Sequence, residues 1–136
     1  MNVSINDIQL KVYELGKLIC APTCFLIVGS LPFVDGSPYV EIRESKYNFI
    51  YSERGFEFSR KTTNSLDELL YWIMVRAANR MALQYEVQNR VDGEDFRRLY
   101  FAKLISLVAS IDVEWGKRIE SEVHNTLISA PYEDDL

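Results

Sequence analysis

The sequence predicts an α+β fold, in which an N-terminal helix and a three-stranded antiparallel meander are followed by three C-terminal helices packed on the meander. Two observations predict it. Apolar residues alternate with polar ones between residues 39 and 61, which is the period of a strand, and elsewhere they recur every three to four residues, which is the period of a helix. Strands and helices that are segregated along the chain favour α+β over α/β. The length of 136 residues is that of one domain, so we expect a single domain over residues 1–136.

The first expected element is a helix over residues 5–19, whose apolar residues form one stripe. Ser4 is its candidate N-cap, and Pro22 marks its end. The short run from Cys24 to Val28 is rich in β-formers and is a candidate buried strand. A loop rich in glycine, serine and proline follows it, up to Pro38.

The meander is expected between Tyr39 and Lys61. Short turns at residues 44–45 and 54–55 divide this segment into three strands, and such short connections join antiparallel neighbours. Alternation along these strands predicts an aromatic face, to which Tyr47, Phe49 and Tyr51 of the middle strand and Phe56 and Phe58 of the last strand contribute.

A helix with an N-terminal capping box follows the meander. The hydroxyl of Ser65 can accept from the Glu68 amide, while the Glu68 carboxylate reaches back to Ser65. The expected apolar stripe runs to about Arg90 and contains Leu66, Leu69, Leu70, Ile73, Ala77, Met81 and Tyr85.

Two more helices complete the expected fold. A turn over residues 92–95 opens one of them, and Asp112 caps the other. The last helix should end before Pro131, with an inner face that consists of Trp115, Ile119, Val123 and Leu127.

The net charge of −5 is concentrated at one end of the chain. Residues 112–136 contain seven acidic and two basic side chains, whereas residues 37–111 contain ten acidic and eleven basic ones. A surface of this kind attracts basic partners and repels nucleic acid. The first candidate partner-binding surface therefore consists of Glu114, Glu120, Glu122, Glu133, Asp134 and Asp135.

A second candidate surface lies at the start of the helix after the meander. Asp67, Glu68, Tyr71 and Trp72 would combine aromatic anchors with carboxylates there. The alternative, that both aromatic side chains belong to the core, has equal weight.

One structural ion pair is also expected. Glu86 precedes the turn at residues 92–95, and Arg97 and Arg98 follow it. If the two helices form an antiparallel hairpin, Glu86 should pair with one of these arginines, and a phosphate site at the arginines is the alternative.

The sequence offers little for catalysis. It contains no phosphate-binding glycine loop, no nucleophile elbow and no zinc-protease motif, and its single histidine, His124, is alone in the last helix. A zinc site would need two ligands beyond Cys20 and Cys24, which we expect to be core or half-buried thiols. We expect no catalytic residue, no metal and no cofactor.

A different class of function stays open at this point. A small regulatory nucleic-acid-binding protein or enzyme could use the basic side chains of Arg76, Arg80, Arg97 and Arg98. The surplus of one basic residue in this part of the chain is small for that role.

A series of short blocks resembles the Immunity protein 63 family. The blocks are residues 65–72, Tyr85-Glu86, residues 90–98 with Phe101, residues 112–115 and residues 131–135. The likeness extends from about Pro38 to Asp135, although residues 74–82 depart from it.

The resemblance implies a bacterial immunity protein that binds and neutralises a cognate polymorphic toxin by occluding it, and no catalytic residues come with it. A basic nuclease is one candidate class of toxin. The N-terminus has no export-signal pattern and no apolar run approaches the ~20 residues of a membrane span, so we expect a cytoplasmic protein without a membrane or nucleic-acid partner. The sequence does not predict an oligomeric state.

Overall fold

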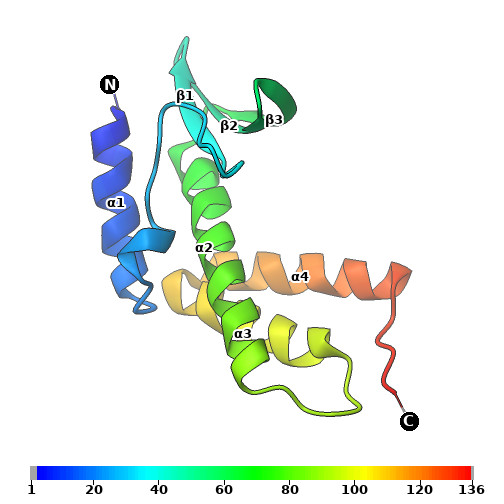
Figure 1. The fold of residues 1–136 in the computed structure, drawn as a ribbon. Helices are drawn as coiled ribbons and strands as arrows, with labels where there is room; N and C mark the ends of the chain where they lie inside the picture. Colours follow the sequence, from blue (N-terminus) through cyan, green and yellow to red (C-terminus); the bar gives the residue numbers. More distant parts are fainter. Residues whose placement is uncertain (1–2, 136) are drawn as a thin grey trace. The chain divides into compact units, whose positions relative to one another are not determined.

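The computed structural model describes residues 3–135 and has the element order that the sequence predicts (Figure 1). The elements are α1 (Ile5–Lys17), η1 (Thr23–Phe25), β1 (Tyr39–Arg43), β2 (Lys46–Glu53), β3 (Phe56–Thr63), α2 (Leu66–Gln88), α3 (Phe96–Ile111) and α4 (Val113–Ser129). The α+β class is therefore confirmed.

The chain divides into two compact units. The N-terminal unit contains residues up to 16 and residues 22–74, and the C-terminal unit contains residues 17–21 and the chain from residue 75 onward. Helix α2 begins in the first and ends in the second. A single domain over residues 1–136, with α3 and α4 packed on the meander, stays a prediction.

In the N-terminal unit, α1 begins at the predicted cap. The Ser4 hydroxyl accepts from the Asp7 amide at 3.1 Å, and the Asp7 carboxylate accepts from the Ser4 amide at 2.9 Å. Ile8 and Val12 are buried on its inner face. At Gly16, an added Cβ would lie 2.4 Å from Cδ1 of Leu26, so Leu26 packs directly on the helix backbone.

The predicted strand at Cys24–Val28 is wrong, because this segment contains the 3₁₀ turn η1 and irregular backbone. The side chain of Gln9 takes the place of a neighbouring strand. Its amide group donates to the Leu26 carbonyl and its oxygen accepts from the Val28 amide, each at 2.7 Å. The backbone of residues 26–28 is thus satisfied without a sheet.

The sheet has the order β1-β2-β3, and both pairs are antiparallel. Arg54 and Gly55 make the second turn with positive φ, as the tight hairpin turns require. The aromatic face is present at Phe49, whose ring packs edge-on against Tyr51 and is stacked on Trp72 of α2 at 6.3 Å.

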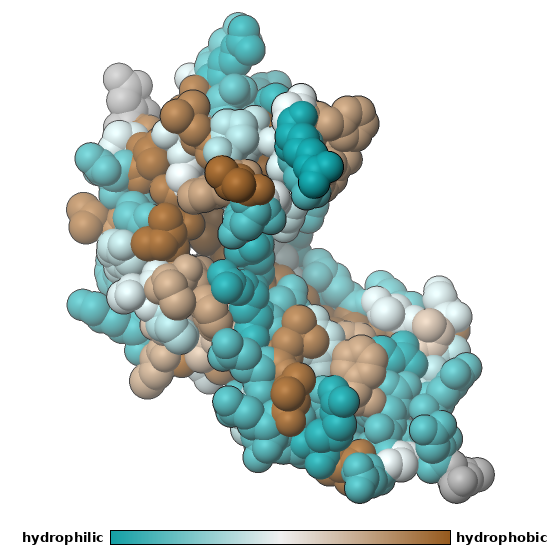
Figure 2. All heavy atoms as spheres, viewed as in Figure 1, coloured by the Kyte–Doolittle hydropathy of each residue, from teal (hydrophilic) through white to brown (hydrophobic). Residues whose placement is uncertain are grey.

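Phe56 and Phe58 of β3 do not join this core. They are exposed and stacked on each other at 6.3 Å, beside a register shift in the pairing of β2 with β3. Figure 2 shows further hydrophobic side chains gathered over α1 and the loop that follows it, where Leu10, Ile27, Leu31 and Val34 are exposed.

In the C-terminal unit, α3 and α4 pack closely and are joined without a loop. Asp112 serves both helices: its amide donates to the Val108 carbonyl at the end of α3, and its carboxylate accepts from the Trp115 amide at the start of α4. An added Cβ at Gly116 would lie 2.6 Å from Cβ of Ala109, so the helices approach closely there. Trp115, Ile119 and Val123 are buried, as the periodicity predicts.

The buried face of α2 differs from the predicted stripe in its second half. Beyond Ala77, the buried residues are Ala78, Ala82 and Glu86, whereas Met81 and Tyr85 retain exposed surface. The inner face therefore ends on a carboxylate, which the apolar pattern of the sequence does not predict.

Candidate partner-binding site

The candidate site is at the start of α3, where Asp95 is the N-cap. The Asp95 carboxylate accepts from the Arg97 amide at 2.9 Å, which satisfies one of the free N–H groups of the first turn. The preceding turn, residues 89–95, contains Gly93 with a φ of +78°.

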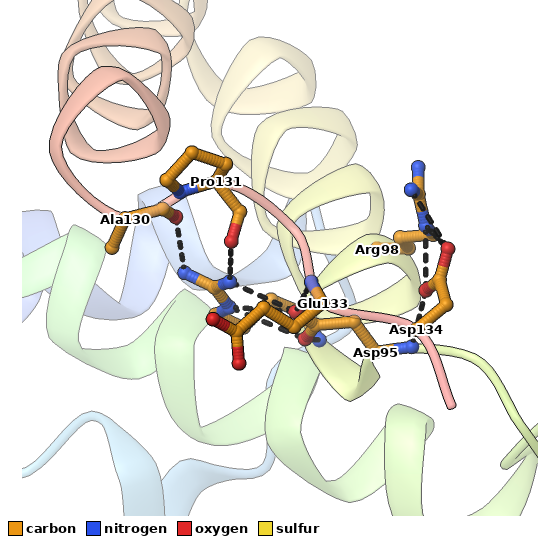
Figure 3. Close-up of polar contacts among 7 residues, drawn as sticks. Asp95, Arg98, Ala130, Pro131, Glu133 and Asp134 are labelled. Atoms are coloured by element: carbon orange, nitrogen blue, oxygen red, sulfur yellow. Dashed lines mark hydrogen bonds and ion pairs between the residues drawn. The ribbon is translucent and has the colours of Figure 1, made fainter. Parts of the chain in front are cut away.

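Arg97 joins this helix start to the end of the chain (Figure 3). Its Nε and Nη2 groups donate to the Asp95 carboxylate, with a shortest distance of 2.8 Å. Its Nη1 and Nη2 groups also donate to the carbonyls of Ala130 and Pro131, each at 2.8 Å. One guanidinium group thereby holds the start of α3 and the chain that leaves α4.

The segment that follows α4, residues 130–135, is named the tail below, and it makes a reciprocal pair of hydrogen bonds with Asp95. The Glu133 amide donates to the Asp95 carboxylate at 2.8 Å, and the Asp95 amide donates to the Asp134 carboxylate at 2.7 Å. Arg98 donates to the same Asp134 carboxylate at 3.0 Å. The tail is therefore tied to α3 through both its backbone and its side chains.

The aromatic ring of Tyr132 in the tail packs against side chains of α3. The guanidinium of Arg98 lies over the ring, 4.2 Å from its centre, and the guanidinium of Arg97 lies at 5.5 Å. Phe101 contacts the ring from α3 at 6.4 Å. These contacts add cation–π and apolar packing to the hydrogen bonds.

The ion pairs shift the pKa values of their members in the expected directions. The hydrogen bonds from Arg97 hold the pKa of Asp95 far below its ordinary value, and those from Arg98 lower the pKa of Asp134. The pKa values of both arginines are raised by the same contacts. All four groups are thus charged at neutral pH.

A cleft of about 500 Å³ opens between the turn and the tail. Its walls are residues 90–97 together with Glu133 and Asp135, and we call it the acidic cleft. Five of its side chains are acidic and two are basic, and the two basic ones, Arg90 and Arg97, are each bound by a carboxylate. Half-exposed Val91 and Phe96 supply apolar surface.

Four carboxylates of the acidic cleft make no ion pair within residues 3–135, namely those of Asp92, Glu94, Glu133 and Asp135. Sequence reasoning assigned Asp92 and Glu94 to the opening of a helix only. The signal that could have joined them to the tail was the second acidic block, after Pro131.

The predicted acidic surface divides into two parts in the structure. On α4, Glu114 lies 3.3 Å from Lys117, and Glu122 lies 3.3 Å from Arg118, so neighbouring bases offset these charges. Glu120 is exposed on the same helix. Glu133, Asp134 and Asp135 belong to the tail, where Asp134 is bound to α3 and the other two are among the residues that line the acidic cleft.

The second candidate surface consists of residues with different exposure. Tyr71 is buried, with 3% of its surface exposed, so it is a core residue. Trp72 is half-buried between Phe49 and Lys61, whose Nζ lies 5.4 Å from the ring centre. The capping bond from the Glu68 amide to Ser65 is present at 3.2 Å, but the Ser65 amide donates to Thr63.

The prediction that Glu86 pairs with Arg97 or Arg98 is wrong, because Glu86 forms its ion pair with a different arginine. Glu86 is buried, and its carboxylate binds Arg90, which lies just beyond the end of α2, at 2.7 Å. Arg97 and Arg98 instead bind Asp95 and Asp134. The tail brings an acidic residue to α3, and the sequence separation of 36 residues hid this partner.

The remaining candidates add no further site. Cys20 and Cys24 are exposed, which corrects the expectation of core or half-buried thiols, and His124 is exposed on α4. Among residues 3–135, no group of three or more histidine, cysteine, aspartate or glutamate side chains could hold a metal ion. None of the helices described is long and apolar enough to cross a membrane.

Comparison with known proteins supports one assignment. The family model of Immunity protein 63 matches residues 44–125, which is more than half of the chain and includes the turn of the acidic cleft but not the tail. Searches of curated proteins and of solved structures found no match to this chain. The chain belongs to the Immunity protein 63 family.

Proposed function

We propose that this protein binds the toxin domain made by its own strain and neutralises it by covering the toxin's active site or substrate face, without catalysis. Membership of an immunity-protein family supports the existence of a toxin partner. The surface proposed to bind this partner lies entirely in the C-terminal unit.

The observation that carries the proposal is the acidic cleft. Carboxylates without an ion pair line a hollow that also contains the apolar side chains of Val91 and Phe96. Lysine and arginine have an aliphatic stem and a charged head, so a basic side chain suits such walls. A toxin with basic residues around its active site, as a nuclease has, is the class of partner that fits.

The acidic residues of α4 have a different role in the proposal. Lys117 and Arg118 offset the charges of Glu114 and Glu122 at short range, so these two carboxylates add little net charge that could attract a basic partner, whereas the exposed Glu120 contributes to long-range attraction. Of the second candidate surface, Asp67, Glu68 and Trp72 are proposed as a secondary contact, and Tyr71 is excluded because it is a core residue.

Charge reversal tests the proposal. A triple variant should lower the association rate with the toxin domain encoded beside this gene, because it removes the attraction at the cleft: Glu94→Lys, Glu133→Lys and Asp135→Lys. A matched control with the same change of net charge alters three exposed carboxylates of the N-terminal unit: Glu14→Lys, Glu44→Lys and Glu53→Lys.

The measurements are binding kinetics at two salt concentrations and the growth of toxin-expressing cells that carry each variant. We expect the cleft variant to lose association rate and protection while it melts at the wild-type temperature. Exposed charges are screened over ~8 Å at physiological salt, so the wild-type rate should fall steeply as salt rises.

Two results would contradict the proposal. One is full protection and an unchanged association rate in the cleft variant, which would shift attention to the surface of Asp67, Glu68 and Trp72. The other is a salt-sensitive gel shift of labelled RNA or DNA by the wild-type protein, which would favour a nucleic-acid-binding role for Arg76 and Arg80 with the α3 arginines.

A further inference from the structure

Arg97 is a basic residue in the wall of an acidic cleft. On charge alone it works against the attraction of a basic partner. Its side chain is one-fifth exposed, so little of it faces solvent. The contacts of its guanidinium group explain why an arginine is present at this position.

The contacts of Arg97 link two parts of the chain that are more than 30 residues apart. Its guanidinium donates on one side to the Asp95 carboxylate and on the other to the carbonyls of Ala130 and Pro131. Only arginine presents several N–H groups in a rigid planar fork that can reach both sides at once. A lysine could satisfy one side or the other.

The tail depends on these contacts for its position. It contains no helix or strand, and chain ends without such ties are usually poorly ordered. The hydrogen bonds that Arg97 makes come just before Tyr132 and Glu133, and the Asp95 carboxylate that Arg97 orients accepts from the Glu133 amide. Release of Arg97 would remove the ties just before Tyr132 and loosen the Glu133 amide from Asp95, while Arg98 and the Asp95 amide would still bind Asp134.

We infer that Arg97 is the positioning residue of the acidic cleft: its guanidinium docks the tail on α3 and thereby holds the Glu133 and Asp135 carboxylates where a basic partner can reach them. This inference rests on the proposed function for its biological meaning. The docking itself is a property of the free protein.

Positioning by Arg97 and attraction by charge alone predict opposite changes in the rate of association with a basic partner. Replacement of Arg97 by glutamine makes the cleft more acidic by one charge, which would speed association with a basic partner if charge alone decided the rate. If positioning decides it, the same replacement slows association. Lys117→Gln on α4 is the matched control, because it removes one positive charge from an exposed pair and leaves the tail contacts intact.

The first experiment uses the free protein and measures amide hydrogen exchange of Glu133. In the wild type this amide donates to Asp95, so we expect it to exchange only when the tail opens. We expect exchange to be faster by at least about tenfold in Arg97→Gln and unchanged in Lys117→Gln. Arg97→Lys keeps the charge but loses the fork, and should also exchange faster than the wild type.

Thermal melts of each variant establish that α3 and α4 remain folded. If Arg97→Gln does not fold, Arg97→Lys carries the test. An unchanged rate of Glu133 exchange in folded Arg97→Gln, or in Arg97→Lys when that variant carries the test, would overturn the inference.

The second experiment measures association with the neighbouring toxin domain. We expect a lower rate for Arg97→Gln and an equal or higher rate for Lys117→Gln. A rise in both would show that charge outweighs position, and would overturn the role of Arg97 in binding. Absence of binding by the wild-type protein would instead contradict the proposed function, while the exchange experiment would still decide whether Arg97 docks the tail.

Discussion

Trp115 lies on the inner face of α4, with 6% of its surface exposed. It follows the cap of α4 by three residues and is flanked by Gly116, which lies against Ala109 of α3. A large aromatic side chain beside such a close approach fills space that no smaller residue could fill.

Trp115→Ala should therefore lower the free energy of unfolding by roughly 3–5 kcal/mol, the range for the loss of a buried large aromatic side chain. Urea unfolding measures the change. Val113→Ala on the same helix is the control, because Val113 is 67% exposed, and it should change stability little. Equal stability of Trp115→Ala and the wild type would mean that the indole contributes to a surface rather than to the core.

At the scale of single residues, the sequence predicts hydrogen bonds between residues close in the chain and misses those between residues far apart in it. The caps at Ser4, Ser65 and Asp112 were predicted because each capping bond closes within three residues. The partners of Arg97 and Arg98 lie more than 30 residues away, and many acidic residues compete for each arginine in sequence alone. Only the path of the tail selects between them.

At the scale of secondary-structure elements, periodicity predicts the helices and strands well. Both hairpins have their turns where the alternation is interrupted, at Glu44-Ser45 and at Arg54-Gly55. The failure at residues 24–28 has a specific cause. A side-chain amide on α1 supplies the donor and acceptor that a neighbouring strand would have supplied, and no pattern within residues 24–28 reveals it.

The packing of α3 against α4 gives an element-scale prediction. Gly116→Ala should destabilise the protein by about 1–3 kcal/mol, although alanine favours helices, because the new methyl group would overlap Ala109 and force the helices apart. The measurement is again urea unfolding.

The double variant Gly116→Ala/Ala109→Gly is the control for this effect. It removes the nearest contact and should recover part of the loss, although the Ala109 backbone stays close. A single variant that is more stable than the wild type would show that α3 and α4 can move apart at no cost.

At the scale of the whole molecule, the lowered pKa values of several carboxylates link stability to pH. Hydrogen bonds from arginine lower the pKa of Asp95, Asp134 and Glu86 in the folded state. A group with a lowered folded pKa contributes stability that is fully present above its unfolded pKa and is lost as the pH falls through its folded pKa. Stability should therefore decrease as the pH falls below about 4.

Urea unfolding between pH 7 and pH 2 tests this dependence. The double variant Asp95→Asn/Asp134→Asn should be less stable than the wild type at pH 7, and the difference should shrink toward pH 2. Asp135→Asn, whose carboxylate makes no ion pair within residues 3–135, is the control and should follow the wild-type curve. A constant difference at all pH values would show that the two aspartates contribute through packing and not through charge.

The candidate site is less predictable than the fold because it depends on how charges from distant parts of the chain come together in the whole molecule. The sequence shows the excess of acidic residues from residue 112 onward. In the structure, neighbouring bases offset Glu114 and Glu122 on α4, and the acidic residues of the tail lie with Asp92 and Glu94 around one cleft. The charges in the sequence identify the acidic segment, residues 112–136. The acidic cleft itself forms only because the tail packs against the turn before α3.

The direct junction at Asp112 has a consequence for how this family can vary in length. One residue ends α3 and begins α4, so an insertion on either side of it would leave one helix end without its cap and would shift Gly116 away from Ala109. Insertions and deletions among related chains should therefore fall elsewhere, with the exposed turn before Asp95 the most tolerant place in the C-terminal unit. That turn forms one wall of the acidic cleft, so a change of length there would reshape the proposed binding surface while the helices stay in register.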